Sequence, residues 1–183
     1  MMDARANYSP GAANVARVEK DGDDWTLVLV KDLRHAPEIV WEALTDPAQL
    51  REWAPFDADG NLGHVGSAKL TTVGAPGPRV TDTKVTRAEK PRLLEYNWGG
   101  FDMRWKLAPS NGGTRLMLYT NIDRRYLAMG AAGWHICFDV LDHLLDGTPI
   151  GRIAGPEAMQ FDGWRRLHAD YAQQFGITPG SNA

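Results

Sequence analysis

The segment from Phe101 to Leu107 constrains the fold more than any other part of the sequence. Within it, every odd-numbered residue is apolar and every even-numbered residue is charged. A period of two predicts a β-strand with one dry face and one wet face. We expect the charged face to be exposed and to form cross-strand charge pairs rather than acid–base chemistry. Gly99-Gly100 before this strand and Asn111-Gly112-Gly113 after it are hairpin signals, so the segment belongs to an antiparallel meander.

Further strands are indicated on both sides of this segment. The stretch from Asp24 to Leu33 alternates with apolar residues on both faces, which predicts a strand that is partly buried on each side. The full set of predicted strands covers residues 24–33, 67–73, 79–89, 93–98, 101–107 and 114–122.

Two prolines predict a pair of short helices after the first strand. Pro37 and Pro47 each suit the first helical position, because the amide hydrogen that proline lacks is not needed there. Asp46 precedes the second proline as an acidic N-cap. Apolar residues at helical spacing follow each proline and end near Trp53.

Helical spacing returns after the strands. One apolar stripe consists of Trp134, Phe138, Leu141 and Leu145 and ends at a capping glycine, Gly147. A second begins near Pro156, consists of Trp164, Leu167, Tyr171 and Phe175, and ends at Gly176. Strands that are grouped apart from helices predict an α+β fold rather than a doubly wound α/β fold.

Composition limits the setting in which the chain works. The 183 residues favour one domain, and the single cysteine, Cys137, excludes an internal disulfide, so we expect a cytoplasmic protein. A net charge of -3 gives no electrostatic case for binding nucleic acid. The longest apolar runs are far shorter than the roughly 20 residues that span a bilayer. We therefore expect no membrane span, and no cofactor motif is visible.

Four motifs resemble one known family in the same order. They are His35 to Pro47 with Leu50 and Trp53, then Glu89 to Trp98, Gly113 to Leu118, and Gly133-Trp134 followed by Leu141 and Leu144. Together they resemble START-like domains, which form the SRPBCC superfamily. They are most similar to its bacterial branch that is named after the activator of the heat-shock protein 90 ATPase.

The resemblance implies a helix-grip fold. In that fold a curved antiparallel sheet wraps around a long C-terminal helix and encloses a cavity. Members of the wider superfamily carry lipids, sterols, plant hormones and polyketides, and a few catalyse cyclisation or hydrolysis.

The domain boundaries follow from this resemblance. We expect a flexible leader over residues 1–20, a single START-like domain over residues 21–176 and a tail over residues 177–183. The chain departs from the family after Gly147, where residues 148–176 add another helix. This helix either closes one end of the cavity or forms a homodimer contact.

The helix-grip fold brings aromatic residues from several elements around one interior. Large aromatic side chains are typical of apolar binding pockets, although they also pack simply as core. A polar group such as Tyr119 or His135 would orient the ligand. The predicted ligand-binding residues are Trp53, Trp98, Met103, Trp105, Tyr119, Trp134, His135, Phe138 and Leu141. We expect the glycine-rich segments at residues 60–66 and 74–78 to form loops at the cavity mouth.

Two chemical alternatives involve the late helix. His135, Asp139 and His143 recur at every fourth position, which suits a shared metal, but no third ligand from elsewhere is evident. We therefore expect a solvated face with histidine–aspartate pairs and no metal. Cys137 would be a nucleophile only beside an oriented base, and we expect a small buried hydrophobe instead.

Three functions remain open from the sequence. The first is the binding of a small hydrophobic molecule without evident catalysis. The second is a chaperone cofactor or regulatory interaction module, which predicts an exposed apolar patch. The third is a cyclase- or hydrolase-like enzyme in the same cavity, which predicts a buried ionisable residue facing the ligand. The sequence names no catalytic residue for it.

Overall fold

A computed structural model of the chain describes residues 4–74 and 79–177. The larger of its two sheets has the strand order β1-β2-β9-β8-β7-β6, and every neighbouring pair is antiparallel. Its strands are β1 (Ala16–Asp21), β2 (Asp24–Leu33), β6 (Arg87–Glu89), β7 (Leu93–Trp98), β8 (Phe101–Ser110) and β9 (Gly113–Asn121). The predicted hairpins at Gly99-Gly100 and at residues 111–113 join β7 to β8 and β8 to β9.

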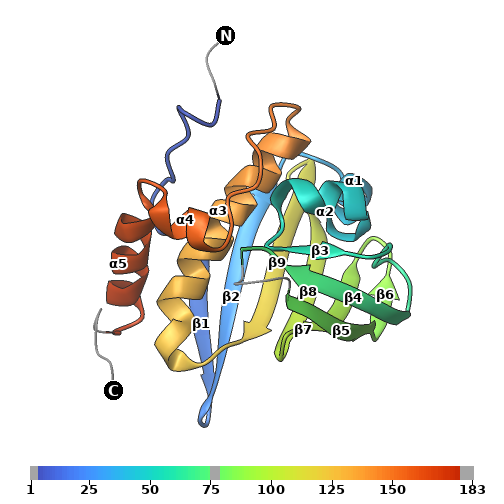
Figure 1. The fold of residues 1–183 in the computed structure, drawn as a ribbon, viewed down its shortest axis with the longest axis horizontal. Helices are drawn as coiled ribbons and strands as arrows, with labels where there is room; N and C mark the ends of the chain where they lie inside the picture. Colours follow the sequence, from blue (N-terminus) through green and yellow to red (C-terminus); the bar gives the residue numbers. More distant parts are fainter. Residues whose placement is uncertain (1–3, 75–78, 178–183) are drawn as a thin grey trace.

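A smaller antiparallel sheet has the strand order β3-β4-β5. Its strands are β3 (Phe56–Ala58), β4 (Gly66–Thr72) and β5 (Arg79–Val85). Figure 1 shows the strands curving around one side of the long helix α3 (Leu127–Leu145), with two short helices at one end of the sheet and the C-terminal helices on the other side of α3. This arrangement is the α+β helix-grip fold that the sequence predicts.

The two short helices form where the prolines predict them. Helix α1 (Pro37–Thr45) and helix α2 (Pro47–Trp53) both begin at proline. The Asp46 side chain accepts a hydrogen bond from the backbone N–H of Ala48 at 3.2 Å, so it caps α2. Both helices pack their apolar faces into the core at one end of the sheet.

Helix α3 is longer than the sequence analysis indicated. It begins at Leu127, directly after a short 3-10 turn (Arg124–Tyr126), and not near Gly133-Trp134. Asp123 starts the turn, since its carboxylate accepts from the backbone N–H of Arg125 at 2.9 Å. No helix within residues 4–74 and 79–177 is long and apolar enough to cross a membrane.

The C-terminal extension contains two helices where the sequence indicated one. Helix α4 (Pro156–Gln160) and helix α5 (Trp164–Gln174) are separated by a turn at Gly163. Gly163 has a φ of 96°, a left-handed conformation that interrupts an α-helix and suits glycine best. Leu167 and Tyr171 of α5 are buried against α3, as their helical spacing predicts.

The end of the predicted leader forms a strand, which the sequence analysis did not indicate. Strand β1 pairs with β2 from Ala16 to Asp21, which satisfies the backbone groups along the β2 edge. Upstream of it, the Tyr8 hydroxyl donates to Asp139 of α3 at 2.5 Å. The polar composition of the segment concealed these backbone and side-chain contacts. Residues 1–3 of the leader and 178–183 of the tail lie outside the described residues.

Candidate functional site

A cavity of about 530 Å³ lies between the first half of α3 and the end of the sheet near Gly99-Gly100. Its walls come from β4, from the β7–β8–β9 meander, from α3 and from the C-terminal extension. The cavity therefore occupies only one end of the space between the sheet and the helix.

One face of α3 forms a wall of the cavity. Met129, Gly130, Gly133, Trp134 and Cys137 line it, and their spacing of three and four residues places them on one side of the helix. A Cβ atom added to Gly133 would meet no atom within 4 Å, so the missing side chain leaves open space. Glycine inside a helix costs about 1 kcal/mol relative to alanine. Sequence reasoning missed both glycines, although two glycines within a helix were a visible signal.

The inner face of the sheet forms the opposite wall. Met103 of β8 and Thr120 of β9 are paired in the β8–β9 register, and both are buried and line the cavity. Trp98 of β7 lines it as well, and its indole N–H donates to the Thr72 hydroxyl at 3.0 Å. This bond fixes the indole ring against the end of β4.

The C-terminal extension closes one end of the cavity. Ala158 and Met159 of α4 and Trp164 of α5 belong to its lining. The backbones of Gly155 and Val73 lie so close that a Cβ at Gly155 would be 2.8 Å from the Val73 carbonyl oxygen. Two glycine-rich segments were predicted at the cavity mouth. None of residues 60–66 lines the cavity. In the second segment Gly74 lines it, and residues 75–78 lie outside the described residues.

The cavity is electrically neutral in the described part of the chain. None of the described residues that line it carries a charged side chain. Burial raises the pKa of the Cys137 thiol to about 12, so this group stays protonated at neutral pH. Such a cavity suits an uncharged ligand, because a buried ion without a partner is expensive.

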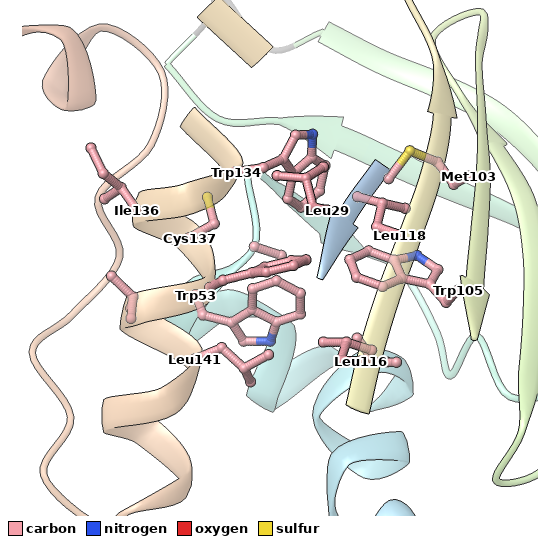
Figure 2. Packing of buried hydrophobic residues seen from close by; sticks show 14 of the residues in the cluster. Leu29, Trp53, Met103, Trp105, Leu116, Leu118, Trp134, Ile136, Cys137 and Leu141 are labelled. Carbon is pink, nitrogen blue, oxygen red and sulfur yellow. The ribbon is translucent and has the colours of Figure 1, made fainter. Parts of the chain in front are cut away.

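Three of the nine predicted ligand-binding residues line this cavity: Trp98, Met103 and Trp134. Four others lie deeper, in the packed part of the core, and they are Trp53, Trp105, Phe138 and Leu141. The Trp105 ring is 6.0 Å from that of Trp53 and 5.7 Å from that of Trp134, as measured between centroids. Figure 2 shows these rings meeting between α3 and the sheet. Side chains thus fill the interior around Trp53 and Trp105, beyond the cavity.

Tyr119 does not face the cavity, contrary to the prediction. It alternates with Leu118 and Thr120 along β9 and lies on the outer face of the sheet, where the Lys106 ammonium sits 5.1 Å from its ring centroid. Side chains of neighbouring strand residues point to opposite faces, which accounts for its position.

His135 does not line the cavity either. Its Nδ1 lies 2.7 Å from the Tyr171 hydroxyl oxygen, and its Nε2 lies 3.5 Å from a carboxylate oxygen of Asp139. The α3 face that the sequence predicted to be solvated is therefore covered by α5 and by the N-terminal segment around Tyr8.

Asp139 is the centre of this covered face. Burial alone would raise its pKa, but hydrogen bonds from His135 and Tyr8 and the charge of Lys31 outweigh burial and lower it. Lys31 donates to the carboxylate at 3.1 Å. His143 does not bond to Asp139: its Nδ1 lies 3.4 Å from the Thr148 hydroxyl, and its ring meets that of Tyr8 edge-on at 6.0 Å between centroids. Within the described ranges, no set of three or more His, Cys, Asp and Glu side chains could hold a metal ion.

The outer face of the meander is charged, as predicted. Arg104 of β8 donates to Glu95 of β7 at 2.8 Å across the strands. These residues line a second pocket, of about 690 Å³, together with Arg87, Arg92 and Lys106. This polar surface contrasts with the cavity on the opposite side of the sheet.

The family model described as Activator of Hsp90 ATPase homolog 1-like protein matches residues 34–146, more than half of the chain. The matched segment includes α1, α2, the meander and α3, and it ends before α4 and α5. Among curated proteins, no sequence relative of the chain is found.

Several solved structures share the fold. CalU16 from Micromonospora echinospora is 20% identical with a TM-score of 0.61, and the match covers 87% of this chain and 94% of CalU16. A conserved protein from Enterococcus faecalis is 15% identical with a TM-score of 0.67, covering 88% and 90%. An AHSA1-like protein from Aeromonas hydrophila is 18% identical with a TM-score of 0.55, covering 67% and 92%. At these identities the likeness concerns the fold alone.

Proposed function

Because the chain belongs to the Activator of Hsp90 ATPase homolog 1-like protein family, a branch of the START-like superfamily, we propose that it binds a small, uncharged hydrophobic molecule. The site is the cavity of about 530 Å³ between α3 and the sheet. The observation that carries the proposal is this volume, walled by apolar and neutral side chains. Ligand pockets in proteins commonly have volumes of about 300–1,000 Å³ and mostly apolar walls.

The shape of α3 supports the proposal. Its cavity face carries Gly133 where a larger residue would be a better helix former. Gly130 on the same face differs, because a Cβ there would lie 2.9 Å from Ile122 Cδ1. Because Gly133 lines the cavity and a Cβ there would meet no atom within 4 Å, a side chain at this position would begin in open space. The glycine therefore keeps space available at some cost to helix stability.

Several lining residues of the cavity are large, apolar and partly exposed, which supports an entry route for an apolar ligand. Phe101, Tyr126, Met129 and Met159 line the cavity and are each between 39% and 47% exposed. Exposed apolar residues that are contiguous with a pocket are typical of binding sites.

Filling the cavity from α3 tests the proposal. The substitution Gly133→Leu places an isobutyl group in the open space, and we expect it to weaken binding of the neutral fluorescent probe N-phenyl-1-naphthylamine by more than about tenfold. Fluorescence titration measures the dissociation constant. Circular dichroism and urea unfolding show whether the variant remains folded.

Gly133→Ala is the matched control. It adds only a methyl group and favours the helix by about 1 kcal/mol, so the variant should be at least as stable as the native chain. Its affinity for the probe should fall far less than that of Gly133→Leu. Equal probe affinity in the native chain and in a folded Gly133→Leu variant would reject binding in this cavity.

A further inference from the structure

Thr120 is a buried polar residue that lacks a hydrogen-bond partner for its side chain. It is 4% exposed, lies on the inner face of β9 and lines the cavity. Across residues 4–74 and 79–177, no protein group is hydrogen-bonded to its hydroxyl. The other two buried threonines differ, since Thr45 donates to the Trp41 carbonyl at 2.8 Å and Thr114 to the His35 carbonyl at 2.7 Å.

The hydroxyl of Thr120 must be accessible from the cavity. In the described part of the chain, every side-chain nitrogen or oxygen that is sealed from solvent has a hydrogen-bond partner. Because the Thr120 side chain is otherwise enclosed, the cavity provides the access. A neutral hydrogen bond contributes about 0.5–1.5 kcal/mol net, so a ligand group that bonds to this hydroxyl from the cavity gains an energy of that size.

The surroundings of Thr120 are apolar. Met103 pairs with it from β8, Leu27 pairs with it from β2, and Ile122, directly after β9, also lines the cavity. The Thr72 hydroxyl, which also lines the cavity, accepts a bond from Trp98 and keeps its own O–H as a donor, but Thr72 is only half-buried. Cys137 contributes a protonated thiol, which is a weak donor. Among the described residues that line the cavity, Thr120 is therefore the buried one whose hydroxyl makes no hydrogen bond.

We propose that Thr120 selects the ligand by donating a hydrogen bond from its hydroxyl to a carbonyl oxygen of a neutral, otherwise apolar molecule. This inference rests on the proposed function and adds the chemical class of the ligand. It also excludes ligands with a buried carboxylate, since none of the described lining residues offers a counter-charge.

A pair of ligands that differ in one oxygen tests the inference. The two probes are 2-acetylnaphthalene and 2-isopropenylnaphthalene, which have nearly the same shape but only the first of which carries a carbonyl. Each displaces N-phenyl-1-naphthylamine from the native chain and from Thr120→Val, which replaces the hydroxyl with a methyl group. We expect Thr120→Val to weaken the ketone relative to the hydrocarbon by about three- to tenfold, the range typical of one neutral hydrogen bond.

The variant Thr120→Ser keeps the hydroxyl and should retain the native ratio of the two affinities, which guards against a folding defect in Thr120→Val. An unchanged ratio in Thr120→Val, with both ligands displacing the probe, would overturn the role of Thr120 while leaving the proposed function intact. If neither naphthalene nor the probe binds the native chain, the proposed function fails, and this inference fails with it.

Discussion

Asp139 joins the N-terminal segment, β2 and α3 through one carboxylate. Tyr8 donates to it at 2.5 Å and Lys31 at 3.1 Å, and His135 links it to Tyr171 of α5. Its neighbour Asp142 also faces Lys31, with a pKa that burial raises. The carboxylate of Asp139 is thus the charged centre of a largely buried polar network, and removing its charge leaves these donors without their partner.

We expect Asp139→Asn to lower the free energy of unfolding at pH 7 by about 2–3 kcal/mol, the usual size for hydrogen bonds to a charged group. The pKa of Asp139 is lowered in the folded chain, so its contribution is present above its unfolded pKa of about 3.9 and is lost as the pH falls through the folded value. The native chain should therefore lose this stability in acid below about pH 4, whereas the variant should lose less there. Urea unfolding at pH 7 and in acid measures both quantities.

Asp32→Asn is the matched control, because Asp32 pairs with Arg115 at the surface with its side chain 62% exposed. Exposed pairs contribute little to stability. Parallel pH curves for Asp139→Asn and the native chain would contradict the role assigned to the network.

Tyr119 and His135 show how far the sequence predicts whether a single residue faces the cavity. Tyr119 was chosen for its hydroxyl, but alternation along its strand already placed it opposite to Leu118, so the sequence contained the information to exclude it. His135 is different. Its burial depends on where α5 docks, and a stripe on α5 predicts that the helix is covered without specifying which surface covers it.

The extension after Gly147 acts through the packing of α5 on α3. Leu167 is fully buried there, and Trp164 at the start of the helix lines the cavity. Leu167→Ala should lower the free energy of unfolding by about 2–5 kcal/mol, the range for truncating a buried leucine. Denaturant titration measures the loss. The exposed Arg165 on the same helix supplies the control, and its substitution by alanine should change stability by no more than about 0.5 kcal/mol. Similar losses in both variants would show that α5 does not pack as described.

The elements that were predicted well have strong local signals. Proline at a first helical turn fixed the starts of α1 and α2, and glycine pairs fixed the hairpins around Phe101. The elements that were missed have weak local signals. Strand β1 has few apolar residues and forms because β2 offers a free edge, which is a tertiary effect. The start of α3 was missed because its first two turns are rich in alanine and glycine.

The interior divides into a filled end and an open end, and this division could not be predicted from the sequence. Trp105 and Trp134 both belong to the apolar faces that the sequence identified, yet the first is packed and the second borders the cavity. Which side chains border space depends on how far α3 stands from the sheet and on how the extension covers the gap. Both are properties of the assembled chain rather than of any local pattern.

A ligand in the open end should stabilise the entire chain by mass action. A neutral apolar molecule that binds only the folded state at a concentration of about 100 times its Kd adds about 2.7 kcal/mol to the free energy of unfolding. For a chain of this size each kcal/mol raises the Tm by about 2–4 °C, so saturating N-phenyl-1-naphthylamine should raise the Tm by about 5–10 °C. Differential scanning calorimetry measures the shift.

Gly133→Leu separates specific from diffuse binding in this measurement. Its filled cavity should leave the Tm nearly insensitive to the probe, even where the leucine itself raises the Tm of the ligand-free variant through better helix propensity. Gly133→Ala should keep most of the shift. Since the cavity is walled jointly by the meander, α3 and the extension, a bound molecule contacts all three and resists their separation. A shift of the same size in the leucine variant would place the probe elsewhere on the molecule and remove the link between this cavity and stability.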